Sequence, residues 1–121
     1  MVTATGIDIT EVKRLRQAVE KWGRGFLNRI FTKEELASAK GRVSLYQHLA
    51  GRFAAKEAIF KAMGDKTLTW KDVQVFNDSE GKPYCKILNN KGKDLEIHIS
   101  ISHVKNYAVA NAIVTPKTQK R

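Results

Sequence analysis

Disulfide chemistry and membrane insertion are excluded by what the sequence lacks. Cys85 is the single cysteine and only two prolines occur in 121 residues. One cysteine permits no intramolecular disulfide and no zinc site built from several thiolates, and it fits a reducing compartment. No hydrophobic run approaches the ~20 residues that a membrane helix requires, and residues 1–5 lack the basic head and apolar stretch of a signal peptide. We expect a cytoplasmic protein without a membrane partner.

Acidic residues are also scarce. The chain has 12 Asp and Glu against 22 Lys and Arg, a net charge of +10. The excess is spread along the chain, so the folded domain itself is basic. This charge predicts an anionic partner, which composition leaves open between nucleic acid, a phosphorylated ligand and an acidic protein. Length and a 42% hydrophobic content predict a single domain over 1–115 with a flexible basic tail over 116–121.

Helical patterns dominate the first half. Residues 5–10 alternate as a short strand, with Ile7 and Ile9 on the face that we expect to be buried. A helix follows at once, with an apolar stripe formed by Val12, Leu15, Val19, Trp22 and Phe26. Capping-box spacing at Thr32 predicts a short helix to about Lys40. A long helix is expected from 45 to 63, ended by Gly64.

Strand patterns dominate the second half. Alternation predicts strands over 73–76, 84–88, 95–102 and 107–114, separated by short turn-forming segments. Short turns favour antiparallel neighbours. The fold class that follows is α+β, with an antiparallel meander packed against the long central helix.

Three carboxylate and ammonium groups are candidates for phosphate chemistry. Asp8 stands between a strand and a helix, where it either caps the helix with Glu11 or binds a hard cation such as Mg²⁺. Glu57 and Lys61 share a face of the long helix with Ala50 and Ala54, whose small side chains let another surface approach. They form either an ordinary ion pair one turn apart or a site that holds a metal and neutralises phosphate.

Further cations have both structural and functional interpretations. Arg52 and Lys56 fall toward the apolar side of the long helix, where their stems follow the core edge or their charges meet an anion. His103, at a strand end, is either structural or catalytic. Arg14, Gln17, Lys21 and Arg24 share one side of the first helix. This basic face is either merely solvated or docks an acidic helix or a nucleic acid backbone.

Four segments in order resemble one family. They are Gly6-Ile7-Asp8-Ile9, the run from Gly51 to Ala58 (GRFAAKEA), Gly81-Lys82-Pro83, and Ser100-Ile101-Ser102-His103. Together they are similar to the holo-acyl-carrier-protein synthases, the small bacterial phosphopantetheinyl transferases, over about residues 5–114. The resemblance implies Mg²⁺-dependent transfer of the 4′-phosphopantetheine group of coenzyme A to a serine of apo acyl carrier protein, in fatty acid biosynthesis. It also implies release of adenosine 3′,5′-bisphosphate and a homotrimer with sites shared between subunits.

The resemblance also implies roles for individual residues. Asp8 and Glu57 match metal carboxylates, and Glu57 and Lys61 are the expected catalytic residues. The residues expected to bind coenzyme A are Arg52, Lys61, Gly64 and His103. The residues expected to meet the carrier protein are Arg14, Gln17, Lys21, Arg24 and Phe26. The alternative is a small basic nucleic-acid-binding domain without catalysis, which leaves the carboxylates at Asp8 and Glu57 unexplained.

Overall fold

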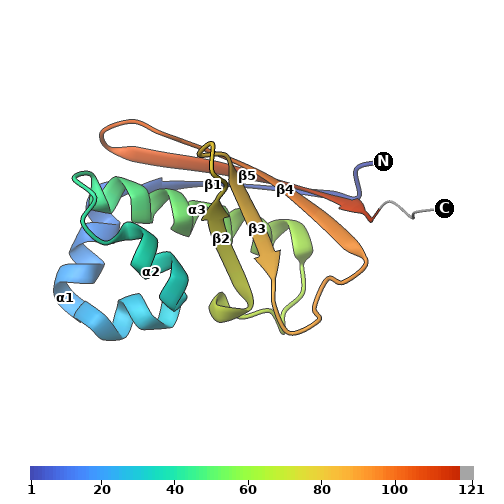
Figure 1. Cartoon of the computed structure of the whole chain (residues 1–121), viewed down its shortest axis with the longest axis horizontal. Helices are drawn as coiled ribbons and strands as arrows, with labels where there is room; N and C mark the ends of the chain where they lie inside the picture. The colour runs from blue at the N-terminus through green and yellow to red at the C-terminus, as the bar shows by residue number, and fades with distance from the viewer. Residues whose placement is uncertain (118–121) are drawn as a thin grey trace.

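A three-stranded antiparallel sheet covers one side of a long helix. The computed structural model describes residues 1–117. The sheet has the order β1 (Ala4–Glu11), β5 (Tyr107–Pro116) and β4 (Leu95–His103). The helix α3 (Leu45–Met63) runs along one face of this sheet, while α1 (Val12–Ile30) and α2 (Lys33–Ala39) gather at one end (Figure 1). The α+β class with a long central helix is therefore confirmed.

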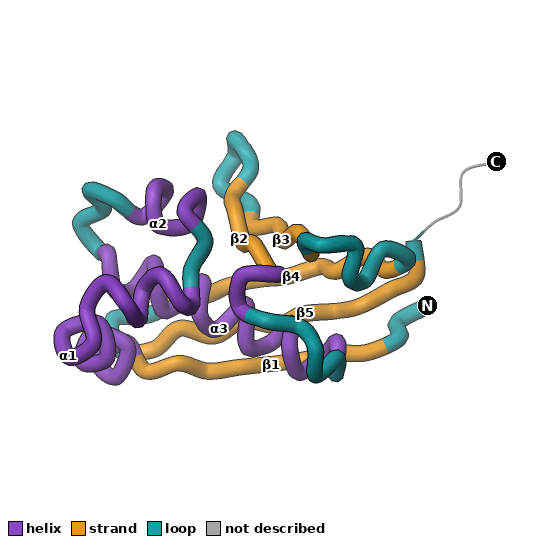
Figure 2. The backbone as a smooth tube through the Cα atoms, turned by 90° about the horizontal axis from the view of Figure 1, so that it is seen from below, coloured by secondary structure: helices purple, strands orange, loops and turns teal. Residues whose placement is uncertain are grey.

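The predicted single meander is wrong between its second and third strands. β2 (Val73–Asn77) and β3 (Pro83–Ile87) form a hairpin of their own, which lies beside β4 (Figure 2) but shares no strand pairing with the larger sheet within the described residues. The segment after β3 is held to the 3₁₀ turn η1 (Trp70–Asp72), because the backbone N–H of Leu88 donates to the carbonyl of Asp72. The Asp72 carboxylate accepts further hydrogen bonds from Asn89 and Lys91. These contacts prevent a tight turn from β3 into β4.

The predicted start of α2 and the predicted end of α3 are confirmed, because local signals determine both. Thr32 and Glu35 form the reciprocal capping box at the start of α2. Gly64 adopts the left-handed conformation, with φ of 65°, directly after α3. At the chain end, β5 extends to Pro116 and the N–H of Lys117 donates to the carbonyl of Asp94. Residues 118–121, the rest of the predicted tail, lie outside the described part.

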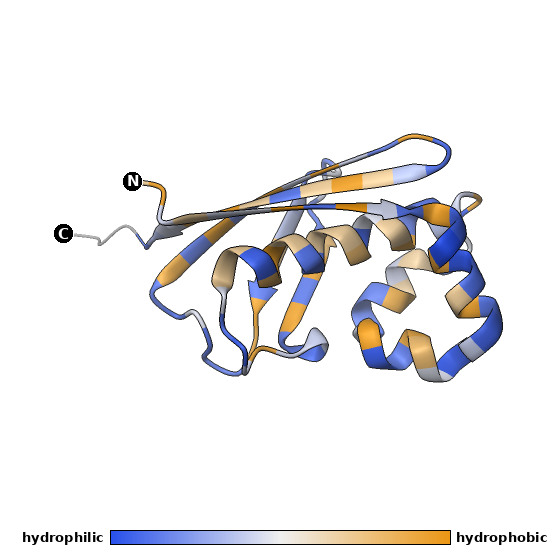
Figure 3. Cartoon of the chain, turned by 180° about the vertical axis from the view of Figure 1, so that it is seen from behind, coloured by the Kyte–Doolittle hydropathy of each residue, from blue (hydrophilic) through white to orange (hydrophobic). Residues whose placement is uncertain are grey.

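The apolar stripe expected along α1 is interrupted. Gly23 has φ of 60° and ψ of −140°, which breaks the helical path. Val12 and Leu15 are buried, whereas Trp22, which also precedes Gly23, is 63% exposed and carries Lys21 over its ring. Figure 3 shows hydrophilic positions along much of this helix. The predicted stripe is therefore wrong at Trp22, and a single helical wheel does not describe the positions beyond Gly23.

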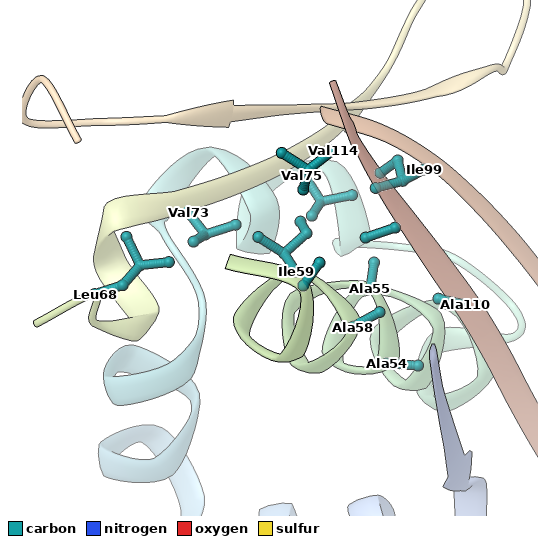
Figure 4. Close-up of a cluster of buried hydrophobic side chains, with 12 residues drawn as sticks. Ala54, Ala55, Ala58, Ile59, Leu68, Val73, Val75, Ile99, Ala110 and Val114 are labelled. Carbon is teal, nitrogen blue, oxygen red and sulfur yellow. The ribbon is translucent and has the colours of Figure 1, made fainter. Parts of the chain in front are cut away.

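The main core lies between α3, the sheet and the β2–β3 hairpin, and α3 contributes mostly small side chains to it. Ala54, Ala55 and Ala58 of α3 are fully buried against the sheet and the β2–β3 hairpin. Figure 4 shows them with Ala110 of the sheet and with larger side chains from α3, the segment after it, the hairpin and the sheet, namely Ile59, Leu68, Val73, Val75, Ile99 and Val114. A second cluster, around Phe31 and Leu49, joins the three helices. Across residues 1–117, no helix combines the length and apolarity needed to cross a membrane.

The inward face of β1 is the opposite of the one we expected. Ile7 and Ile9 are 65% and 67% exposed, whereas Gly6 and Thr10 are buried. A Cβ atom on Gly6 would lie 2.0 Å from the carbonyl oxygen of Ala58. The strand thus approaches α3 too closely for any side chain at this point, and the isoleucines face away from the helix. The predicted alternation along β1 is confirmed, but the predicted buried face is wrong.

Candidate active site

The close contact between β1 and α3 brings two distant carboxylates together. Asp8 lies two residues after Gly6 on the same strand face, and Glu57 lies one residue before Ala58 on the helix. Both line one pocket of about 340 Å³, together with Arg14, Phe26 and Phe53 among others. We call this the carboxylate pocket. The expectation that alanines on α3 admit a neighbouring surface is confirmed, because Ala54 is fully buried.

Asp8 is held by hydrogen bonds and does not cap α1. The hydroxyl of Thr10 donates to its Oδ2 at 2.8 Å, and Nζ of Lys61 lies 3.3 Å from its Oδ1. The same ammonium donates to the carbonyl of Ile7 at 2.9 Å. Glu11 is the residue before α1, and no side chain caps that helix start. Of the two interpretations of Asp8, capping is wrong, and binding of a hard cation stays a prediction.

The pKa of Glu57 is raised above the ordinary value of a glutamate. Burial raises the pKa of its carboxyl, the charge of Asp8 raises it further, and Lys61 opposes both effects. Lys61 forms its ion pair with Asp8 of β1, and within the described chain no Glu57–Lys61 bridge accompanies it. Two carboxylates that line one pocket and repel each other favour a bound cation, because a cation relieves their repulsion.

The donor set fits a magnesium ion. Within residues 1–117 no group of three or more His, Cys, Asp or Glu side chains converges. Mg²⁺ needs only one or two protein carboxylates, because water and phosphate oxygens complete its shell. Asp8 and Glu57 meet that requirement, whereas zinc sites use three or four protein ligands.

A second pocket collects the remaining motifs. Its volume is about 450 Å³, and its walls include Arg52 of α3, Pro83 of β3 and His103 of β4. Gly51 closes the wall against the sheet, where a Cβ would lie 3.0 Å from Cγ2 of Ile101. We call this the basic pocket. The three motifs that follow Asp8 in the sequence thus meet in one place.

Arg52 is the buried cation of this pocket. Arg52 is 6% exposed, and its Nε has no hydrogen-bond partner among the described residues. Burial lowers the pKa of the guanidinium, and the charge of Arg42 lowers it further. A buried cation without a partner is costly, so the pocket is prepared for an anion. Sequence reasoning missed Arg42, Gln47, His48 and Asn77 in the same walls.

Lys56, unlike Arg52, forms an ion pair within the protein core. Its Nζ lies 2.6 Å from Glu35, and both side chains are fully buried. The ammonium also donates to the carbonyls of Ile30 and Trp70. Of the two interpretations left open for Lys56, an anion does meet it, but that anion is a side chain of the same core.

The residues expected to meet the carrier protein do not all line one pocket. Arg14 and Phe26 both line the carboxylate pocket, and Gln17 and Lys21 are exposed on the same helix. Arg24 follows Gly23 and lines a separate groove. Gly64 ends α3 and is absent from the walls of both the carboxylate and the basic pocket. Arg24 is therefore separated from Arg14 and Phe26, and Gly64 is separated from Arg52 and His103.

Known proteins share both the sequence and the fold. The model of the 4′-phosphopantetheinyl transferase superfamily matches residues 4–112. Holo-[acyl-carrier-protein] synthase of Thermodesulfovibrio yellowstonii is 44% identical over 116 residues, covering 95% of this chain and 100% of that protein. The Halothermothrix orenii synthase is 42% identical over 118 residues, covering 91% and 94%.

Solved structures agree with these relatives. The Bacillus anthracis holo-(acyl-carrier-protein) synthase, solved in complex with CoA (3′,5′-ADP), has a TM-score of 0.84 and 38% identity, covering 97% of this chain and 99% of that one. The Helicobacter pylori synthase, in complex with coenzyme A, has a TM-score of 0.84 and 27% identity, covering 92% and 99%. With its carboxylate and basic pockets formed from the family's motifs, this chain belongs to the holo-[acyl-carrier-protein] synthases of the 4′-phosphopantetheinyl transferase superfamily.

Proposed function

We propose that this chain transfers the 4′-phosphopantetheine group of coenzyme A to a serine of apo acyl carrier protein, with Mg²⁺, and releases adenosine 3′,5′-bisphosphate. The observation that carries this proposal is the division of charge: a carboxylate pair in one pocket and an unpartnered buried arginine in the other. The first suits a metal-bound pyrophosphate, and the second suits the phosphates of the nucleotide.

The reaction requires one proton acceptor and one neutralised leaving group. The serine oxygen forms a bond to the phosphorus attached to pantetheine, and the bond from that phosphorus to the bridging oxygen breaks. Asp8 and Glu57 would hold Mg²⁺, which when bound neutralises pyrophosphate charge. Glu57 accepts the serine proton, directly or through water. Lys61 supplies a fixed positive charge beside Asp8.

Two copies of the chain complete one site. Asp8 lies on β1 and His103 on β4, which are opposite edges of the three-stranded sheet. The two pockets share no lining residue. We infer that the carboxylate pocket of one copy faces the basic pocket of the next, a head-to-tail contact that closes into a ring. The family resemblance sets the number of copies at three.

The outer face of the sheet offers a surface for this contact. Ile7 and Ile9 are exposed there, and Ile9 pairs with Val109 of β5. The exposed polar residues of β4 lie on the same face, namely Glu96, His98, Ser100 and Ser102. Exposed apolar residues rimmed by polar ones are typical of contacts between proteins.

The carrier protein approaches along α1 in this proposal. Arg14 and Phe26 line the carboxylate pocket, so a helix docked on α1 would bring its serine close to Glu57. Basic residues on α1 suit an acidic partner, and opposite charges mainly speed the encounter and set orientation. A nucleic acid partner is disfavoured, because Asp8 and Glu57 would repel a phosphate backbone.

The setting that we propose is fatty acid biosynthesis in the cytoplasm. The relatives are named for acyl carrier protein as their substrate. Cys85 is half-buried, and burial raises the pKa of its thiol to about 12, so the thiol stays protonated and unreactive.

The decisive experiment is an intact-mass assay. Apo acyl carrier protein is incubated with coenzyme A, Mg²⁺ and this chain, and we expect the carrier to gain one phosphopantetheine group. The matched controls are a carrier whose acceptor serine is alanine and a reaction with excess chelator, both of which should stay unmodified. An unchanged carrier mass in the complete reaction would refute the proposed function.

A further inference from the structure

A histidine that no role above uses lies in the basic pocket. His48 precedes Arg52 by one turn of α3 and lines the same pocket. Its Nε2 is buried and finds no hydrogen-bond partner in the part of the chain that the structure describes. The atom therefore faces protein rather than open pocket, so His48 senses a ligand through charge and not through a contact at Nε2.

The charges that face His48 are all of one sign. They come from three elements: Arg52 on α3, Arg42 in the segment before α3, and His103 at the end of β4. No aspartate or glutamate is among the residues that line this pocket. Burial first, and then these neighbours, lower the pKa of His48 to about 4. The empty pocket thus holds His48 neutral at physiological pH.

We propose that an anionic nucleotide entering the basic pocket drives proton uptake at His48, so that nucleotide binding and His48 protonation are coupled. The inference rests on the proposed function, because it takes that nucleotide to be the adenosine 3′,5′-bisphosphate part of coenzyme A. Its phosphates would offset Arg42 and Arg52, the cations that disfavour a charged imidazole. His48 is thus a positioning residue that tunes affinity.

The direction of the pH effect follows from linkage. Protonation that is easier in the complex than in the free protein strengthens binding as pH falls. The gain in nucleotide affinity begins as pH falls to the pKa of His48 in the complex. It is complete at about 4, the pKa of His48 in the free protein. Within that window affinity rises by up to about tenfold per pH unit. Coenzyme A binding would therefore be tighter at mildly acidic pH than at neutral pH.

A histidine NMR titration tests this directly. The chain has three histidines, so the ring resonances can be followed individually with and without adenosine 3′,5′-bisphosphate. We expect the pKa of His48 to rise above about 5 on binding, and His98, on the outer sheet face, to stay unchanged. If His103 responds to the nucleotide while the pKa of His48 does not move, this inference fails and the proposed pocket survives. If no histidine responds and calorimetry detects no binding, both fail.

Two variants separate His48 from its neighbour. Calorimetry at pH 5.5 in buffers of different ionisation enthalpy gives the number of protons taken up with the nucleotide. We expect His48→Gln to lower this uptake while nucleotide binding at pH 8 stays within about twofold of wild type. Protons contributed by the nucleotide itself are common to both proteins and cancel in the difference. Uptake that persists in His48→Gln and disappears in His103→Gln would overturn the assignment, and a purely structural His48 would change stability without changing uptake.

Discussion

Two lysines five residues apart on α3 have opposite surroundings. Nζ of Lys56 lies 2.6 Å from Glu35 with both side chains fully buried, whereas Nζ of Lys61 lies 3.3 Å from Asp8 with its side chain 54% exposed. Lys56 uses its three protons on Glu35 and two backbone carbonyls. Five residues turn a helix by about 140°, so the two side chains point to different sides of α3.

The difference separates a structural lysine from a functional one. Lys56 has no donor left for a ligand, and removing either partner would leave a buried charge. Lys61 is accessible and weakly held, so it can exchange Asp8 for a phosphate oxygen at small cost. The sequence places Lys56 toward the apolar side of α3 and Lys61 on the face of Glu57, and the structure adds that Lys56 is fully buried against Glu35.

The largest effect should come from breaking the buried pair. Lys56→Ala leaves Glu35 charged in the core and should lower the free energy of unfolding by about 3–5 kcal/mol. Lys61→Ala is the matched control, with a loss below about 1 kcal/mol. Urea denaturation followed by circular dichroism measures both. Equal losses in the two variants would contradict the assignment of Lys56 to structure.

The second largest effect should be a loss of activity when the carboxylate beside the exposed Lys61 is removed. Asp8→Ala removes both a metal carboxylate and the partner of Lys61, so transfer should fall about 10²-fold or more while the fold survives. Glu57→Ala should behave alike, because it removes the second carboxylate. Initial rates of carrier modification at saturating Mg²⁺ measure this loss. Wild-type turnover in either variant would remove the carboxylate pocket from the mechanism.

Docking on α1 should show a smaller change. Arg14→Glu places a negative charge beside the carboxylate pocket and should raise KM for carrier protein about tenfold, with KM for coenzyme A nearly unchanged. The defect should shrink with added salt, because screening weakens the new repulsion. Arg24→Glu, beyond the break at Gly23, is the comparison variant and should do less. An equal defect at both positions would mean that the docking surface spans the break.

The smallest expected effect is a gain in the free energy of unfolding when Glu57 is replaced by glutamine. The raised pKa of Glu57 means that the folded protein holds this proton more tightly than the unfolded chain does. Charging Glu57 therefore costs stability as pH rises through its folded pKa, and the cost is absent below the unfolded pKa. Without metal, Glu57→Gln should be slightly more stable than wild type at pH 7 and equal at pH 3.5. Denaturation midpoints across this range measure the difference, and a less stable variant at pH 7 would reverse the assigned sign.

Local rules account for the elements that sequence reasoning placed correctly. The capping box at Thr32, the left-handed Gly64 and the alternation along β4 depend on residues that are neighbours in the chain. Such interactions are formed within one turn or one strand, so the sequence contains all their partners. The family motifs likewise pointed to Asp8, Glu57, Arg52 and His103 before their pockets were known.

Contacts between distant segments account for the rest. Alternation at Ile7 and Ile9 divides β1 into two faces, but the close approach of Gly6 to Ala58 decides which face is buried. Lys56 and Glu35 are 21 residues apart in the chain, and no local pattern links them. The sequence by itself thus determined the helices, the strands and the chemistry that the site contains. Tertiary packing decided which groups are buried, which carboxylate each lysine meets, and that the two pockets lie at opposite sheet edges, because burial depends on what covers a residue and not on the residue alone.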